Sequence, residues 1–262
     1  MGVDMKRYLL ASLASLALLS GSAFAASMPV PAYKAPPPPA PAPSWTGCYI
    51  DAGGGYGLYN QIHSSYAVPS GAPISGTSNG GGEGWLGRVG GGCDYQFSVS
   101  SLGNFVIGVF GDYDFTHIHG TFDNTFSASG GDENESGAWG VGGRLGYLIT
   151  PSLMSYFDGG YTQARFDQTN LSFLALFPVP PAFASFPATT YNGWFIGGGT
   201  EYALNMNWMP IRGLFWRNEY RYASYDNKNV QETFFTGVLG SGDQMKTNVQ
   251  TITSSLVWRF NW

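Results

Sequence analysis

Charged residues are scarce in this sequence. They make up 11% of its 262 residues, and the formal net charge is −5. Nucleic-acid binding requires clustered Lys and Arg, which this chain lacks, so we exclude a nucleic-acid partner. The low charge and the 16% aromatic content are also unlike a disordered chain. After residue 25, no apolar run reaches the ~20 residues of a membrane-spanning helix. If the protein enters a membrane, we expect it to do so with β-strands.

The N-terminal residues are predicted to lie outside the folded domain. A basic start, the apolar run Tyr8–Leu19 and an Ala-Phe-Ala cleavage pattern predict a signal peptide over residues 1–25. Residues 26–44 contain MPVPAYKAPPPPAPAP, which favours an extended polyproline II spacer in the periplasm. Residues 45–262 are predicted to form one β-domain.

The last stretch, Lys246–Trp262, has a side-chain period of two from Ile252 onward, with one face far more apolar than the other. This is the period of a β-strand. An apolar strand with an open edge promotes aggregation in a soluble protein. A closed barrel, with lipid outside and a polar lumen inside, removes that edge. We therefore predict a closing strand whose C-terminal insertion signal is Trp258, Phe260 and Trp262.

Eight segments have the pattern of strands that cross a bilayer. They are Trp45–Tyr59, Trp85–Phe97, Phe105–His117, Ala138–Ile149, Leu153–Gln168, Tyr191–Leu204, Leu214–Tyr225 and the closing stretch. Short connections alternate with long ones, as in barrels with tight periplasmic turns and long outer loops. The predicted outer loops are Asn60–Gly84, Ile118–Gly137, Thr169–Thr190 and Asp226–Met245. The predicted fold is all-β, an eight-stranded antiparallel up-and-down transmembrane β-barrel.

Charged residues lie on one face of these segments. In Leu214–Tyr225, for example, charged and apolar side chains alternate along the whole segment. An Arg or Lys facing lipid at mid-depth costs about 2–4 kcal/mol, so the charged face is expected to line the lumen. Eight strands enclose a space that side chains fill, and each buried charge there needs a partner. The expected lumen charge network contains Arg88, Arg144, Glu201, Arg217, Glu219, Arg221 and Arg259, with Asp94, Asp112 and Asp158.

The two cysteines lie in neighbouring predicted strands. When the strands are phased by their polar residues, Cys48 and Cys93 both point outward near the periplasmic end. The periplasm is oxidising, so a disulfide is feasible if the two positions are opposed in register. The alternative is a pair of unpaired thiols. We predict no metal site at these cysteines, because no histidine accompanies them.

Several motifs in order along the chain carry a resemblance to a known family. They are WTGCYI at 45–50, GCDYQF at 92–97, FVIGVFGDY at 105–113, GWFIGGGTEYAL at 193–204, NEYRY at 218–222 and LVWRFNW at 256–262. With the signal peptide and Pro-rich leader, they resemble the small outer-membrane β-barrel proteins of alphaproteobacteria. These are immunogenic, porin-family surface proteins, related in architecture to eight-stranded OmpA-like barrels. The resemblance implies a Gram-negative outer-membrane location, surface exposure and antigenicity, but no enzymatic activity.

Two features of the predicted outer end bear on ligands. His117 and His119 share a strand face and are weak candidates for a metal or haem iron, as some family members are linked to haem; we favour two rim residues. The segment Leu171–Pro187 is unusually apolar for an outer loop. It can dip into the outer leaflet, plug the barrel mouth or meet a partner, and we favour leaflet or rim packing. No cofactor is expected.

The sequence therefore predicts a structural, surface-exposed barrel that supports the envelope and presents loops, with no catalysis. The alternatives are a narrow porin-like channel for small solutes and a surface receptor for a ligand such as haem. The expected partners are outer-membrane lipid, the barrel-assembly machinery and periplasmic chaperones during insertion, and host or surface ligands at the loops.

Overall fold

The computed structural model describes residues 43–124, 129–173, 180–204 and 213–260, which form antiparallel β-structure. Among these residues, no helix is long and apolar enough to cross a bilayer. The strands are β1 (Gly47–Tyr66), β2 (Ser78–Val99), β3 (Gly103–Asn124), β4 (Ser129–Thr150), β5 (Leu153–Phe166), β6 (Thr169–Phe173), β7 (Ala184–Phe186), β8 (Thr189–Ala203), β9 (Leu214–Tyr225), β10 (Lys228–Phe234) and β11 (Leu239–Phe260).

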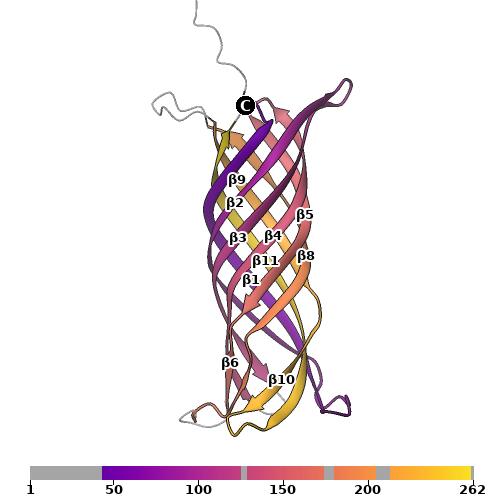
Figure 1. Cartoon of the computed structure of the whole chain (residues 1–262), viewed down its shortest axis with the longest axis vertical. Helices are drawn as coiled ribbons and strands as arrows, with labels where there is room; N and C mark the ends of the chain where they lie inside the picture. Colours follow the sequence, from indigo (N-terminus) through magenta and orange to yellow (C-terminus); the bar gives the residue numbers. More distant parts are fainter. Residues whose placement is uncertain (1–42, 125–128, 174–179, 205–212, 261–262) are drawn as a thin grey trace, which may run out of the picture. The chain divides into compact units, whose positions relative to one another are not determined.

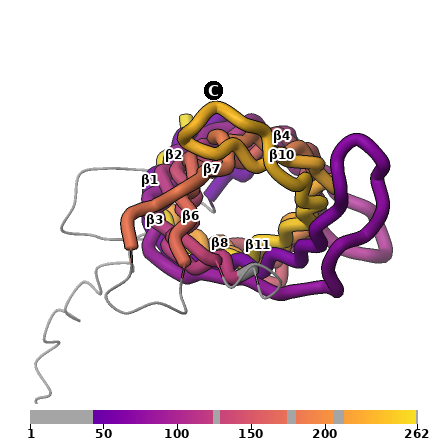
Figure 2. Tube along the Cα trace, turned by 90° about the horizontal axis from the view of Figure 1, so that it is seen from below, coloured from indigo at the N-terminus to yellow at the C-terminus, as the bar shows by residue number. Residues whose placement is uncertain are grey.

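Within the described residues, eight strands close into a ring in the order β1-β2-β3-β4-β5-β8-β9-β11. The ring closes because β11 pairs with β1 from Cys48↔Phe260 to Tyr66↔Gly242. Figure 1 shows the strands winding obliquely around the barrel, and Figure 2 shows the ring seen along it. Closure satisfies the backbone groups of every strand edge in the bilayer. The predicted eight-stranded up-and-down barrel is confirmed.

The burial pattern of the strands follows the alternation in the sequence. In β9, Phe215, Arg217, Glu219 and Arg221 are buried, whereas the residues between them are exposed or partly exposed. Because successive side chains point to opposite faces of a strand, the charged residues lie inside with Phe215, whereas Trp216 and Tyr220 lie outside. The predicted assignment of lumen and lipid faces is therefore correct.

Two rings of exposed aromatic side chains mark the lipid-facing belt. The inner ring is formed by Tyr95, Tyr147, Tyr202 and Trp258, and the outer ring by Trp85, Tyr113, Trp139, Tyr161 and Trp194. Aromatic girdles of this kind lie at the two membrane interfaces. The membrane-spanning segments are accordingly 50–58, 85–95, 105–115, 139–147, 153–161, 194–202, 214–222 and 252–260.

The barrel continues beyond the outer aromatic ring, where we predicted loops. β1 extends to Tyr66, and β3 extends to Asn124. β6 follows β5, β7 precedes β8, and β10 follows β9, each across a break of two residues. These short strands pair in the order β4-β6-β7-β10-β11. Figure 1 shows β6 and β10 beyond the ends of β5 and β8. The prediction of four long outer loops was wrong, because these polar and Gly-rich segments have no apolar outer face yet still pair as strands.

The interior of this outer extension is an apolar core. Its buried members include Tyr59, Ile118, Phe122, Phe166, Leu171, Ala184, Phe186, Tyr191, Val230 and Met245. Leu171, Ala184 and Phe186 come from the segment for which we predicted leaflet or rim packing. That prediction was wrong for these three residues, because β6 and β7 turn them inward against Phe122 and its neighbours. Residues 174–179 of the segment lie outside the described residues.

Candidate functional site

The half of the lumen nearer the periplasm is organised around Glu201. Its carboxylate is fully buried and accepts hydrogen bonds from Arg259 Nη2 at 2.6 Å, Arg217 Nε at 3.0 Å and Arg144 Nη1 at 3.2 Å. These arginines come from β11, β9 and β4. Asp94 on β2 ion-pairs with Arg144 and, at 2.7 Å, with Arg259 Nη1. Charge-assisted bonds thus join five strands from across the ring, because Glu201 itself lies on β8.

The outer half of the lumen holds a second cluster. Arg88 on β2 donates from Nε to Asp114 Oδ1 at 2.6 Å and from Nη1 to Glu219 Oε1 at 2.7 Å. Arg221 donates to both oxygens of Asp112, at 2.9 and 2.8 Å, and to Glu219 Oε1 at 2.9 Å. Glu219 therefore bridges two arginines, and β2, β3 and β9 are joined across the interior.

Each residue of the predicted charge network faces the lumen, and the structure brings the network into contact. Asp158 is at its margin, 3.9 Å from Arg221 Nη2. Asp51 and Asp114 were missing from the predicted set, although both pair with arginines. Their inward position was readable from strand phase. Only the tertiary structure shows that Asp51 lies 3.1 Å from Arg217, across the intervening strand β11.

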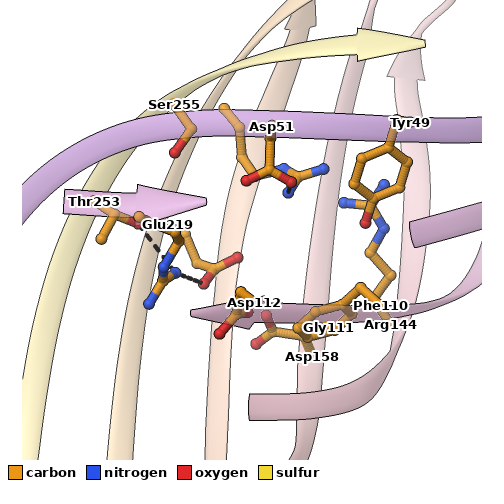
Figure 3. Close-up of a pocket in the computed structure, with 12 residues that line it drawn as sticks. Tyr49, Asp51, Phe110, Gly111, Asp112, Arg144, Asp158, Glu219, Thr253 and Ser255 are labelled. Atoms are coloured by element: carbon orange, nitrogen blue, oxygen red, sulfur yellow. Dashed lines mark hydrogen bonds and ion pairs between the residues drawn. The ribbon is translucent and has the colours of Figure 1, made fainter. Parts of the chain in front are cut away.

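The side chains leave little free space in the lumen. A void lined by Tyr49, Asp51, Asp112, Glu219 and neighbouring residues has a volume of about 10 Å³ (Figure 3). A second void, nearer the outer rim, has about 20 Å³. Each is large enough for about one water molecule. Close packing relies on glycine at lumen positions such as Gly92, where a Cβ would lie 2.7 Å from the Tyr49 hydroxyl.

Cys48 and Cys93 are opposed in register and form a disulfide, so the candidate disulfide is confirmed over the alternative of unpaired thiols. The bond joins β1 to β2 on the outer wall near the periplasmic end. It closes a sequence separation of 45 residues, so it restricts the unfolded chain.

We expect the purified barrel to show no thiol that reacts with maleimide after unfolding in denaturant, and two after reduction. The Cys48→Ser variant is the matched control and should expose one thiol, that of Cys93, without reduction. Labelling of the unreduced wild type would contradict the disulfide.

His117 and His119 lie on the outer wall of β3, just beyond the outer aromatic ring, with ring centroids 6.2 Å apart. Nδ1 of His117 is 2.8 Å from the Thr116 carbonyl oxygen, and Nδ1 of His119 is 2.6 Å from Asn134 Oδ1. In the described part of the chain, no cluster of three or more His, Cys, Asp or Glu side chains suits a metal ion. The ligand role of the two histidines stays a prediction.

The aromatic residues of the closing strand lie on the lipid-facing wall. Trp258 is exposed, and its ring centroid is 4.5 Å from that of Phe260. Trp262 lies outside the described residues. The role of these residues as an insertion signal stays a prediction.

Glu133 and Glu135 belong to the predicted outer loop Ile118–Gly137, where solvated carboxylates are expected, but the structure buries both in the outer extension, so this expectation was wrong. Glu133 accepts a hydrogen bond from Gln61 Nε2 at 3.0 Å through Oε1. The Oε2 atoms of Glu133 and Glu135 have no partner among the described residues. Burial raises the pKa of Glu133 to about 7, and burial together with the charge of Asp114 raises the pKa of Glu135 to about 8.

The closed ring, aromatic girdles and charged interior together define a transmembrane β-barrel of the outer-membrane type. A family model described as outer membrane protein beta-barrel domain matches residues 11–260, and the chain belongs to this family. It is similar to the 31 kDa outer-membrane immunogenic proteins of Brucella melitensis and Brucella suis, with 29% identity over 261 residues, 98% of this chain and 100% of each relative. The protein is thus located in the Gram-negative outer membrane, as its motifs predicted.

Solved outer-membrane structures are similar at low sequence identity. The protease OmpT of Escherichia coli is 12% identical, with a TM-score of 0.42 and coverage of 83% of this chain and 98% of that chain. Neisserial surface protein A is 12% identical, with a TM-score of 0.35 and coverage of 82% and 98%. The attachment invasion locus protein of Yersinia pestis is 11% identical, with a TM-score of 0.34 and coverage of 81% and 99%.

Proposed function

We propose that the protein is a closed structural barrel that supports the outer membrane and presents its outer extension at the cell surface, without catalysis. The observation that carries the proposal is the filled interior. Arginines and carboxylates cross-link the strands within the membrane, and an apolar core occupies the barrel above it. Buried ion pairs of this kind favour one arrangement of the strands, because a shifted register would separate the charges.

The same packing disfavours the alternative of a narrow channel. Voids of about 10 and 20 Å³ have room for isolated waters and not for a continuous column of water. An ion in transit would have to displace arginine–carboxylate pairs such as Arg259–Glu201, whose atoms are 2.6 Å apart. The aromatic residues above them, including Phe122 and Phe166, would then have to separate as well.

Single-channel recording in planar bilayers tests this proposal directly. We expect no steady openings from the folded protein under conditions in which a general porin, reconstituted in the same lipid, conducts. Folding is checked by the change in gel mobility on boiling that folded barrels show. Reproducible steps of conductance from the heat-modifiable species would refute the closed barrel and favour the channel.

The arrangement of polar residues at the outer end supports a non-catalytic role. Ser65 Oγ donates a hydrogen bond of 2.6 Å directly to Asp243 Oδ1, whereas His63 Nε2 lies 3.0 Å from the Asp123 carbonyl oxygen. A catalytic triad needs the imidazole between the serine and the acid. We therefore propose that these residues stabilise the extension.

The exposed positions of the protein indicate the partners we propose. The lipid-facing wall contacts outer-membrane lipid, and the closing strand is presented to the barrel-assembly machinery and periplasmic chaperones during insertion. The extension rises above the outer girdle, where host or surface ligands contact it. The Brucella relatives bear the description immunogenic, and we propose that the extension is the corresponding antigenic surface of this chain.

A further inference from the structure

Four neighbouring strands carry a row of small polar side chains on the lipid-facing wall. Ser155 on β5 is the register partner of Thr200 on β8. Thr200 is in turn paired with Asn218 on β9, and Asn218 is paired with Ser254 on β11. Register partners on one face of antiparallel strands lie side by side. The row therefore runs without interruption across these strands and continues to Gly54, the partner of Ser254.

Asn218 lies in the hydrocarbon layer. It is four residues from Leu214 and four from Tyr222, the two ends of the membrane-spanning part of β9. At about 3.3 Å per residue and a tilt near 40°, this places it roughly 10 Å from either interface. Its neighbours Arg217 and Glu219 point into the lumen, so its amide projects outward, where it is exposed.

The hydrogen-bonding groups of the row are incompletely satisfied. Ser254 Oγ accepts a hydrogen bond of 2.7 Å from Trp216 Nε1. Within the described part of the chain, the Asn218 amide and the Thr200 hydroxyl have no partner. Hydrocarbon contains no water to supply one, and an amide transferred to it without a partner is strongly disfavoured. These groups therefore need a contacting surface that supplies hydrogen-bond donors and acceptors.

The other side of the barrel is different. Between the aromatic rings, the outward positions of β2, β3 and β4 are filled by exposed aliphatic residues, glycine and the disulfide-bonded Cys93. The aliphatic residues are Val89, Ile107, Val109, Val141 and Leu145. Lipid chains solvate such a surface fully. The polar row is thus confined to one side of the barrel, as expected of a contact surface and not of a general lipid-facing wall.

We propose that this row is the contact surface between two copies of the chain in the outer membrane. An asparagine amide both donates and accepts, so Asn218 can pair with Asn218 of a second copy across a two-fold axis. The small side chains at Ser155, Ser254 and Gly54 allow two barrel walls to approach closely. No other partner is required by the chemistry, because the row is complementary to itself.

Cross-linking in native outer membranes tests the contact. Thr200→Cys places a thiol in the row, and Val141→Cys places one on the aliphatic side at an exposed belt position away from the disulfide. With a short lipid-soluble bismaleimide, we expect Thr200→Cys to give a product of twice the monomer mass and Val141→Cys to give none. Equal products from both positions, no product from Thr200→Cys, or a product containing a different protein would each overturn the proposal.

The second arm tests the amide. In the Thr200→Cys background, Asn218→Leu should lower the yield of dimer about tenfold. Asn218→Gln should restore it, because it keeps the amide. The shift in gel mobility on boiling confirms that each variant is folded. If Asn218→Leu does not fold, the comparison of the two cysteine variants still tests the contact surface. A full dimer yield from folded Asn218→Leu would overturn the role of the amide.

Discussion

Replacing Glu201 by alanine is expected to lower the free energy of unfolding by about 3–5 kcal/mol. The carboxylate is fully buried and contacts Arg144, Arg217 and Arg259. Its loss leaves three guanidinium groups in the lumen with Asp94 and Asp51 as their remaining carboxylate partners. The destabilisation comes mainly from buried positive charge that is no longer compensated, and less from the loss of any single hydrogen bond.

The change is measured as the shift of the guanidinium unfolding midpoint in detergent micelles, followed by heat-modifiable gel mobility. Glu83→Ala is the matched control, because Glu83 lies exposed on the outer wall of β2, and it should leave the midpoint within experimental error. Glu201→Gln should cost less than Glu201→Ala, since the amide oxygen still accepts hydrogen bonds. An unchanged midpoint in Glu201→Ala would contradict the structural role of the ionic lumen.

The protein is expected to lose stability as the pH rises from about 4.5 to about 8, through Glu133 and Glu135. In the folded state, the pKa of these groups is raised from 4.5 to about 7 and about 8. Between these values the folded protein keeps protons that the unfolded chain has released. The stabilising contribution of the protonated carboxyls is therefore complete below pH 4.5 and is lost as the pH passes the folded pKa values.

The surroundings of the two carboxyl groups explain why their pKa values are raised and why stability falls as the pH rises. Glu133 has Gln61, Tyr59 and Tyr191 around it, and Glu135 faces Asp114 and Tyr225. Neither has a cation as a hydrogen-bonded partner among the described residues. Ionisation therefore leaves a negative charge in an apolar core with weak compensation, unlike the carboxylates of the membrane-spanning lumen.

We expect the double variant Glu133→Gln/Glu135→Gln to be more stable than wild type by about 3–5 kcal/mol near pH 8.5 and equal to it near pH 4.5. The measurement is the unfolding midpoint across this pH range. Glu83→Gln, on the exposed wall, should follow the wild-type curve. A double variant with the wild-type pH dependence at every point would show that these carboxyls do not carry it.

The membrane-spanning barrel could be predicted from the sequence because two solvents act on each strand there. Along Phe105–His117 and Leu214–Tyr225, hydrocarbon on one face and ionic contacts on the other force an alternation of rings and charges. The periplasmic ends of the strands were accordingly predicted within a few residues. The shared outward face of the two cysteines followed from the same phase argument, whereas their opposition came from the register of β1 with β2.

The outer extension could not be predicted in this way, because water replaces lipid outside it. In Ser129–Glu135 or Lys228–Gln231, polar residues occur on both faces, so the alternation fades although the backbone pairing continues. The inward turn of Leu171 and Phe186 depends on the pairing of β6 with β4 and β7, which connects residues about 40 apart in sequence, such as Gly130 and Ser172.

The sequence by itself determined that this chain forms a barrel, which side of each strand faces lipid, and which charges lie inside, because strand period and hydrocarbon exposure act locally. Tertiary structure alone decided which arginine meets which carboxylate, that the outer segments form a core instead of loops, and that Ser155, Thr200, Asn218 and Ser254 align. The physical reason is register: the side chain that a residue meets across a sheet is set by how strands slide past one another, and no single strand encodes that.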